Sequence, residues 1–321
     1  MSILESIVLG IIQGLTEFFP ISSSGHMVLV PYLFGWDYPP LYYAVFLHFA
    51  TLMSLVTVFY RDIFRIIKAL FAGVFLVSSR RNSRRNDTER NYERDSYFRL
   101  GLFLIVATIP SVVVGLLLEK QVERLFSRPF IVSIFLVFTA CLLWVGEWRG
   151  KVWENRVYKP DGDKIQRYAI RVEDEGGEKG YRNEEIKFGF TSSIIVGLAQ
   201  AIAIFPGISR SGATISSGRF FGISREDCVR FSFLLSIPII LGSFVFELIS
   251  AREIIFNGFI FMDNIQNLAV SALGFISSYV TGLFAIKFLL RFTRTRSLNV
   301  FGLYCLLVGI AVFLVYLFRS F

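Results

Sequence analysis

The sequence is poor in the residues that build disulfide frameworks and cysteine- or histidine-rich metal centres. Its three cysteines, Cys141, Cys228 and Cys305, lie in or beside apolar runs and have no paired spacing. We therefore interpret them as buried thiols rather than as disulfides or metal ligands. Histidine occurs twice, at His26 and His48.

The N-terminus lacks the features of a cleaved signal peptide. No basic stretch precedes the first apolar run, Glu5 lies within that run, and no small-residue cleavage site follows it before Glu17. We therefore expect this segment to remain in the mature protein.

Apolar sequence is what the chain has in abundance. Hydrophobic residues make up 54% of it, and the mean hydropathy is +0.58, well above that of a soluble domain. A helix needs about 20 residues to cross a bilayer. We predict an all-α integral membrane protein whose six transmembrane helices lie at residues 42–60, 99–118, 130–147, 229–248, 264–289 and 298–318.

The net charge of +8 is concentrated in a few loops. Arginine and lysine are dense between residues 61 and 99, and again between Lys287 and Arg296. These residues flank membrane spans, so we attribute them to the positive-inside bias and to attraction by anionic lipid, and we expect no nucleic-acid partner. The basic loops are therefore placed in the cytoplasm.

Two segments of the chain repeat one another. Residues 13–26 align without a gap on residues 200–213, and both contain Gln, a short apolar run, Phe, Pro and Ile-Ser-x-Ser-Gly. An apolar run broken by Pro, Ser and Gly indicates a broken helix, which is tolerated where the backbone is buried in protein or lines a wet cavity. We predict two re-entrant helical hairpins, at residues 3–34 and 189–221.

An odd number of predicted spans, three, separates the two copies, so the second copy is expected to be inverted in the membrane relative to the first. This gives a first repeat at 1–149, a soluble cytoplasmic insertion at 150–187 and a second repeat at 188–321. Within the basic loop 61–98, we expect residues from 78 to 96 to be disordered or loosely helical. Pro160-Asp161-Gly162 predicts a turn, and hence a small hairpin, in the insertion.

The first copy carries two polar side chains inside its apolar run. Glu17 lies within the apolar run, where burying an ionisable side chain is costly and usually serves a function. The alternative is that Glu17 lies near the membrane interface and reaches water. Gln13 lies one helical turn earlier and faces the same side. That spacing suits a shared metal ion or a hydrogen-bonded water, so Glu17 and Gln13 are the candidate metal ligands.

The first break is rich in hydroxyl groups. Its serines either cap the return helix or, together with the free N–H groups of that helix, bind phosphate; the candidate residues are Ser22, Ser23, Ser24 and Gly25. His26 is either a satisfied interior imidazole or an acid/base group within reach of Glu17, and we favour the acid/base role. His48 lies in the first span and is a candidate supporting residue.

The second copy places Arg210 at membrane depth, where it requires an anionic partner. A guanidinium group suits bidentate contact with phosphate oxygens. Permanent pairing with Glu17 is the alternative, and an ion pair and a phosphate site are compatible. Further donors and a close backbone approach are expected from Ser209, Ser211, Gly212 and Thr214. Together these groups imply an amphiphilic ligand with an anionic head group.

Both motifs resemble those of the undecaprenyl-diphosphate phosphatases of the bacitracin-resistance (BacA/UppP) type. The first, Glu/Gln-x-x-x-Glu followed by Pro-x-Ser-Ser-x-Gly-His, is found at residues 13–17 and 20–26. The second, Pro-Gly-x-Ser-Arg-Ser-Gly-x-Thr, is matched at every position by residues 206–214, and Phe-Ser-Phe-Leu-Leu-Ser-Ile-Pro at 231–238 is also similar. The chain departs from many members at Gln13, where they have Glu, which weakens this residue as a charged metal ligand.

The resemblance implies a hydrolase that converts a polyprenyl diphosphate into the monophosphate and phosphate. Such an enzyme recycles the lipid carrier of peptidoglycan and other envelope glycans and confers bacitracin resistance. The resemblance also implies a divalent metal, magnesium or calcium, and a plasma-membrane site that opens to the outer face. A homodimer is left open.

The resemblance also assigns roles to the site residues. Ser23 is the candidate nucleophile, with a metal-activated water as the alternative. Glu17 binds metal or acts as the base, His26 assists proton transfer, and Arg210 clamps the diphosphate. A transporter or flippase of an anionic polyprenyl lipid is the rival function, because broken helices and inverted repeats are transporter architecture. A purely structural scaffold leaves the charges of Glu17 and Arg210 unexplained.

Overall fold

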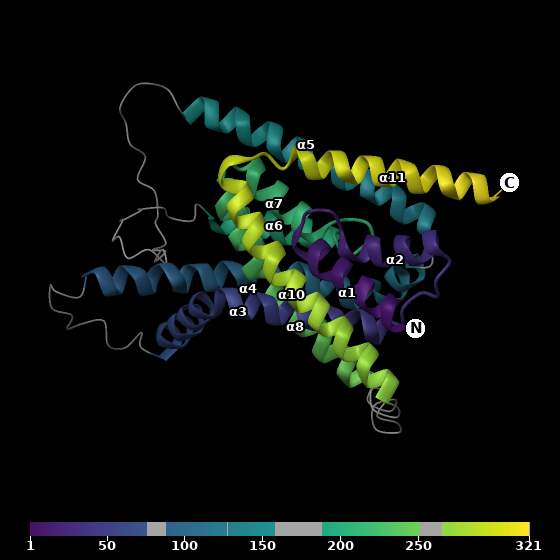
Figure 1. Cartoon of the computed structure of the whole chain (residues 1–321). Helices are drawn as coiled ribbons and strands as arrows, with labels where there is room; N and C mark the ends of the chain where they lie inside the picture. Colours follow the sequence, from purple (N-terminus) through teal and green to yellow (C-terminus); the bar gives the residue numbers. More distant parts are fainter. Residues whose placement is uncertain (76–87, 127, 158–187, 251–264, 321) are drawn as a thin grey trace.

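The computed structural model describes residues 1–75, 88–126, 128–157, 188–250 and 265–320, and its regular elements within these ranges are all α-helices (Figure 1). In chain order they are α1 (Ile3–Phe18), α2 (Ser23–Phe34), α3 (Leu41–Phe75), α4 (Thr88–Leu125), α5 (Pro129–Val157), α6 (Phe190–Ile202), α7 (Arg210–Phe220), α8 (Arg225–Ser250), α10 (Ile265–Thr295) and α11 (Asn299–Ser320).

The six predicted spans are confirmed as helices. In the described ranges, α3, α4, α5, α8, α10 and α11 are the six that are long and apolar enough to cross a membrane. All six reach beyond the predicted bounds at one end or both, and α3, α4 and α5 do so by the most residues. Helix α3 continues to Phe75 across a kink at Phe59 (φ −105°, ψ 18°), and α5 continues to Val157.

Two predictions fall partly or wholly on residues outside the described ranges. Within the segment 78–96, residues 88–96 form the start of α4, and the rest lies outside the description. The hairpin expected around residues 160–162 also lies outside it.

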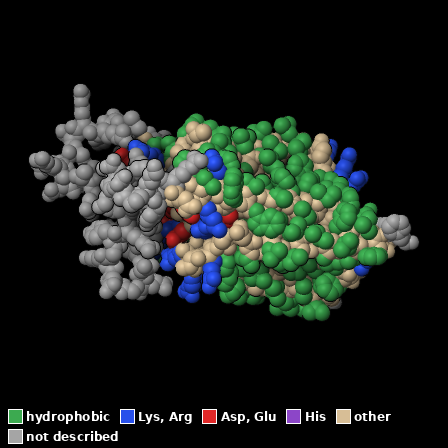
Figure 2. Space-filling model, turned by 90° about the horizontal axis from the view of Figure 1, so that it is seen from above, with side chains coloured by type: hydrophobic (Ala, Val, Ile, Leu, Met, Phe, Trp, Pro, Cys, Tyr) green, Lys and Arg blue, Asp and Glu red, His purple; other side chains and the backbone are tan. Residues whose placement is uncertain are grey.

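The surface of the helical body is apolar, whereas many buried side chains are polar. Hydrophobic side chains cover most of the face seen in Figure 2, and Lys and Arg gather near the end beside the grey residues. Phe64, Leu117 and Phe318 are 67%, 72% and 81% exposed. Fully buried hydroxyls include Thr51, Ser54, Ser193 and Ser278. An apolar surface around buried polar groups is what lipid surroundings require. Together with the six apolar helices, it indicates a multi-pass membrane protein.

Two short helix pairs, α1–α2 and α6–α7, carry the repeated segments. Helix α1 stops at Phe18 because Pro20 follows and disfavours helical backbone at the residue before it. Ser22 then caps α2 by accepting a hydrogen bond from Gly25 N–H. The second pair has the same plan, since α6 ends before Pro206 and Ser209 caps α7. The helix–break–helix structure of both copies is confirmed, and their path through a membrane remains a prediction.

Glycines let the first helix of each pair approach a long helix closely. A Cβ at Gly10 would collide with Ser277 and with the backbone of Gly274 in α10. Its counterpart in the second copy, Gly197, lies equally close to the backbone of Ala107 in α4. Small residues at such contacts are typical of packed membrane helices. They fix α1 and α6, and therefore the breaks that follow them.

Near the C-terminal end of α7, ion pairs join α7 and the start of α8 to α5. Arg219, whose side chain is buried, donates to Glu154 at 2.8 Å and to the Ile223 carbonyl at 2.8 Å. Arg225 at the start of α8 donates to both carboxylate oxygens of the buried Glu147 in α5. Helix α7 is therefore fixed at its end as well as at its capped start.

Candidate active site

Glu17 is the centre of the polar cluster, and its carboxylate accepts hydrogen bonds from both copies of the repeat. Arg210 Nη2 donates to Oε1 at 2.5 Å. Ser23 Oγ donates to Oε2 at 2.6 Å, and Gln13 Nε2 donates to the same oxygen at 2.8 Å. Glu17 is only 5% exposed. The sequence-based expectations that Gln13 faces Glu17 and that Arg210 comes to meet it are therefore matched by the geometry.

The two breaks also touch through their backbones. A Cβ at Gly25 would lie 3.2 Å from Gly207 Cα, so glycine permits this approach. Ser211 Oγ in the second break donates to the Phe19 carbonyl in the first at 3.1 Å. The expected meeting of the two copies is thus present in hydrogen bonds, packing and an ion pair.

The imidazole beside Glu17 belongs to His48 in α3 rather than to His26. His48 Nε2 lies 3.3 Å from Glu17 Oε2, and its Nδ1 lies 2.7 Å from the Ala44 carbonyl. His26 Nδ1 is bonded to the Ser22 carbonyl at 2.7 Å, and its Nε2 to Tyr304 Oη at 2.8 Å. The hydrogen bonds of His26 therefore do not go to Glu17 or Ser23, which corrects the expectation of contact with these residues.

Most of the hydroxyls expected to bind phosphate have partners in the protein. Ser22 and Ser209 are N-caps that accept from the N–H groups of Gly25 and Gly212. Thr214 Oγ1 bonds with Ser232 Oγ at 2.7 Å. The remaining serines lie beside the two caps, with Ser24 Oγ at 3.4 Å from Ser22 Oγ and Ser211 Oγ at 3.2 Å from Ser209 Oγ. Capping is thus the observed role of Ser22 and Ser209.

Two buried polar atoms beside the carboxylate have no hydrogen-bond partner within the described part of the chain. They are Arg210 Nη1, a cationic donor, and Gln13 Oε1, a neutral acceptor. Buried polar groups without partners are costly and call for an explanation. Arg210 Nη1 suits a phosphate oxygen, and Gln13 Oε1 suits a metal ion or a donating group, so an anionic ligand together with a cation or a donor would satisfy both atoms.

The family model described as bacitracin resistance protein BacA matches residues 6–311. The chain belongs to the BacA family. It is 37% identical to the undecaprenyl-diphosphatase of Korarchaeum cryptofilum, with 97% of this chain and 98% of the relative covered. It is 36% identical to that of Desulforudis audaxviator, with 100% of both covered. Identity to that of Pelotomaculum thermopropionicum is 37%, over 100% of this chain and 99% of the relative.

The oxygen atoms of Glu17 and Gln13 fit a divalent metal ion that is bound together with phosphate oxygens. Within the described ranges, no three His, Cys, Asp or Glu residues are arranged to hold a metal by themselves. This BacA-family chain offers one carboxylate at Glu17 and the unpartnered amide oxygen of Gln13. Magnesium is commonly held by one or two carboxylates together with substrate phosphates. Glu17 and Gln13 are therefore the residues that would hold it.

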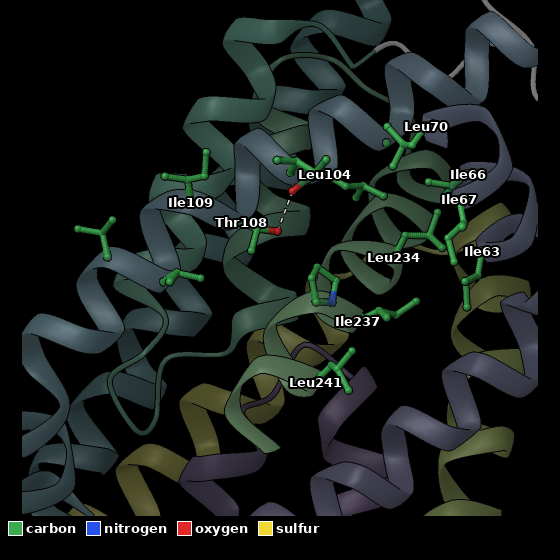
Figure 3. Close-up of a pocket in the computed structure, with 15 residues that line it drawn as sticks. Ile63, Ile66, Ile67, Leu70, Leu104, Thr108, Ile109, Leu234, Ile237 and Leu241 are labelled. Atoms are coloured by element: carbon green, nitrogen blue, oxygen red, sulfur yellow. Dashed lines mark hydrogen bonds between the residues drawn. The ribbon is translucent and has the colours of Figure 1, made fainter. Parts of the chain in front are cut away.

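An apolar groove of about 470 Å³ opens between α3, α4 and α8 and contains none of these polar groups (Figure 3). Aliphatic side chains such as Leu70, Leu104 and Leu234 point into it, and the hydroxyl of Thr108 is bonded to the Leu104 carbonyl at 2.7 Å. The groove offers no group for acid–base or phosphate chemistry. The Glu17 cluster is therefore the candidate chemical site of this BacA-family member.

Proposed function

We propose that this protein hydrolyses a polyprenyl diphosphate, such as undecaprenyl diphosphate, to the polyprenyl monophosphate and inorganic phosphate. Family membership and the names of the full-length relatives support the substrate class. The observation that carries the proposal is the carboxylate of Glu17, bonded at once to the Ser23 hydroxyl and the Arg210 guanidinium. A base, a nucleophile and an anion clamp are the parts that phosphoryl transfer requires.

In the proposed reaction, Ser23 Oγ attacks the terminal phosphorus atom while its proton passes to Glu17 Oε2, 2.6 Å away. The bond from that phosphorus to the bridging oxygen breaks, and the bridging oxygen leaves with the polyprenyl monophosphate. Water then hydrolyses the phosphoserine and releases phosphate. A hydroxyl is a poor nucleophile at neutral pH, and an adjacent base removes that limitation.

Arg210 stabilises the negative charge on the diphosphate during this transfer. Its Nη2 is held by Glu17, which orients the guanidinium plane, and its Nη1 is left to bind a phosphate oxygen. A divalent ion, magnesium or calcium, would supply further charge neutralisation of the phosphate oxygens beside Glu17 and Gln13.

The membrane arrangement belongs to the same proposal. The helix pairs α1–α2 and α6–α7 are re-entrant hairpins of an inverted repeat, with the halves at 1–149 and 188–321 joined by a cytoplasmic insertion. The charge distribution supports placing Arg61 to Arg99 and Lys287 to Arg296 in the cytoplasm. The protein resides in the plasma membrane, and its site opens to the outer face, where the lipid carrier is regenerated for envelope glycan synthesis.

A phosphate-release assay on the purified protein in detergent tests the proposal. With magnesium or calcium and no membrane gradient, we expect one phosphate per polyprenyl diphosphate, over substrates from C15 to C55 in tail length. Arg210→Ala serves as the inactive control. A wild-type protein that releases no phosphate in detergent, but moves the labelled lipid between leaflets in vesicles, would instead support the transporter function.

A further inference from the structure

The first break contains a backbone conformation that its residue type does not favour. Ser22 has φ 70° and ψ 97°, and it is the one non-glycine residue with positive φ in the described ranges. Such conformations are sterically unfavourable for L-residues with a side chain and persist only where surrounding contacts enforce them. The second break avoids this, since Gly207 takes φ 100° and Ser209 has an ordinary φ of −71°.

His26 holds the peptide group that follows Ser22. The Ser22 carbonyl accepts the backbone N–H of His26 at 3.2 Å and the ring Nδ1 at 2.7 Å. This carbonyl belongs to the peptide that joins Ser22 to Ser23. Its orientation therefore sets where Ser23 Cα lies, and with it the 2.6 Å hydrogen bond from Ser23 Oγ to Glu17.

Tyr304 in α11 holds the other side of the same imidazole. Its Oη lies 2.8 Å from His26 Nε2, and the two rings are stacked at 5.7 Å with an interplanar angle of 10°. A carbonyl oxygen only accepts, so Nδ1 carries the proton in the bond to Ser22. In the neutral ring, Nε2 is then the acceptor, and the Tyr304 hydroxyl donates to it.

The second break is supported in a parallel way by α5. Thr139 Oγ1 accepts from Ser209 N–H at 3.0 Å and donates to the Gly207 carbonyl at 3.0 Å. There, Ala213 occupies the position of His26, and its side chain has no hydrogen-bonding group. The imidazole is thus found in the first copy. In that copy the break contains the strained Ser22, and the group that donates to Glu17 is a serine hydroxyl rather than an arginine guanidinium.

We propose that His26 and Tyr304 are positioning residues that hold the Ser22–Ser23 peptide so that Ser23 reaches Glu17. His26 acts through the backbone of Ser22 and takes no proton from the substrate or from Ser23. Tyr304 fixes the orientation and the Nδ1–H tautomer of His26. This inference rests on the proposed function, in which Ser23 is the nucleophile.

Two substitutions at His26 separate positioning from proton transfer. His26→Asn places an amide N–H near the position of Nδ1, where it still donates to the Ser22 carbonyl, whereas His26→Gln places its amide nearer Nε2. We expect kcat of His26→Asn to exceed that of His26→Gln by roughly tenfold. If His26 transfers protons, neither amide replaces it and both variants lose activity equally, which would overturn the proposal.

Tyr304 holds His26, and His26 holds the Ser22 carbonyl; we call this arrangement the brace. Tyr304→Phe removes the hydroxyl from the brace while keeping the ring that stacks on His26. Loss of the hydroxyl leaves Nε2 without its donor, so we expect kcat to fall roughly tenfold with KM changed by less than about twofold. Tyr316→Phe removes a hydroxyl from the same helix, beside Phe130, and is the matched control. An unchanged kcat in Tyr304→Phe would count against the brace.

A measurement that does not depend on turnover distinguishes failure of the brace from failure of the proposed function. The chain has two histidines, so ¹⁵N-histidine NMR of the purified protein gives two ring systems, and the His48→Gln variant assigns them. We expect the His26 ring as the Nδ1–H tautomer, with an Nε2 shift that changes in Tyr304→Phe. An Nε2–H tautomer of His26 in the wild type would refute the brace, even if the enzyme is active. An Nδ1–H tautomer of His26 in a wild type that releases no phosphate would refute only the proposed function.

Discussion

Ser23 and Arg210 occupy the same position in the two copies of the repeat, and they donate to opposite oxygens of one carboxylate. Ser23 Oγ lies 2.6 Å from Glu17 Oε2, and Arg210 Nη2 lies 2.5 Å from Oε1. One buried acid therefore aligns the proposed nucleophile with the proposed anion clamp. In the proposed mechanism each half of the chain depends on the other, because neither contains all three groups.

Replacing Arg210 should abolish turnover without unfolding the protein. We expect Arg210→Ala to lower kcat by about 10³-fold or more, since charge stabilisation in phosphoryl transfer reaches that size. Arg210→Lys should recover little, because a point charge does not reproduce the planar guanidinium held by Glu17. Phosphate release measures the loss, and Arg294→Ala, at a half-exposed arginine paired with Glu226, is the control. Normal activity in Arg210→Ala would remove Arg210 from the site.

Ser23→Ala separates a covalent route from direct attack by water. If Ser23 attacks phosphorus, the variant should lose about 10³-fold or more of kcat at every magnesium concentration. The wild type should then carry a phosphoserine in rapid-quench labelling from a radiolabelled terminal phosphate. Ser217→Ala, which removes a hydroxyl bonded to the Ala213 carbonyl in α7, controls for the loss of a helix serine. Slow turnover by Ser23→Ala, with no label on the wild type, would support attack by metal-activated water.

The helix pairs could be predicted from sequence because their signals are local. Pro20 and Pro206 each follow an apolar run and disfavour helical backbone at the residue before them, and a serine shortly after each proline is a common cap. The four-residue spacing of Gln13 and Glu17 likewise fixes their shared face within one helix. Apolar length sufficed to locate the spans, although α3, α4 and α5 continue well beyond the predicted segments.

The contacts of the histidines could not be predicted, because they depend on how separate helices pack. His26 follows the serines in sequence and resembles an acid/base partner, yet its ring turns toward Ser22 and Tyr304. His48 reaches Glu17 from α3, and the only signal for it was a polar ring in an apolar span that needs a partner. Tyr304 gave no signal at all, since tyrosine is common in membrane helices.

Gln13→Glu should strengthen binding of the divalent ion. The change adds a second carboxylate beside Glu17, and ligand charge raises affinity for hard cations. We expect the magnesium concentration for half-maximal phosphate release to fall by about tenfold, and to rise in Gln13→Ala, which removes the amide oxygen. Identical magnesium dependence in the wild type and both variants would exclude residue 13 from the metal site.

Removing Glu147 should destabilise the fold more than removing an exposed ion-pair partner. Its buried carboxylate accepts from Arg225 Nη2 at 2.8 Å and from the Leu298 N–H at 3.2 Å. Glu147→Ala leaves both donors without this partner, which should cost about 3 kcal/mol of unfolding free energy. Glu226→Ala removes the partner of the half-exposed Arg294 and should cost less than about 1 kcal/mol. Thermal unfolding in detergent compares them, and equal shifts would contradict the structural role of Glu147.

Single cysteines introduced into a chain without native cysteines test the inverted orientation of the two halves. The positions Arg85 and Lys164, which lie outside the described ranges, belong to the loop and the insertion that the charges place in the cytoplasm. Cysteines there should react with an impermeant thiol reagent only after the cell is opened. A cysteine at Glu123, near the far end of α4, should react in intact cells. Phosphate release by each variant confirms a native fold, and labelling at position 85 from outside would contradict the orientation. That result would reverse the whole chain in the membrane and turn the Glu17 site toward the cytoplasm, where it could not act on lipid diphosphate in the outer leaflet.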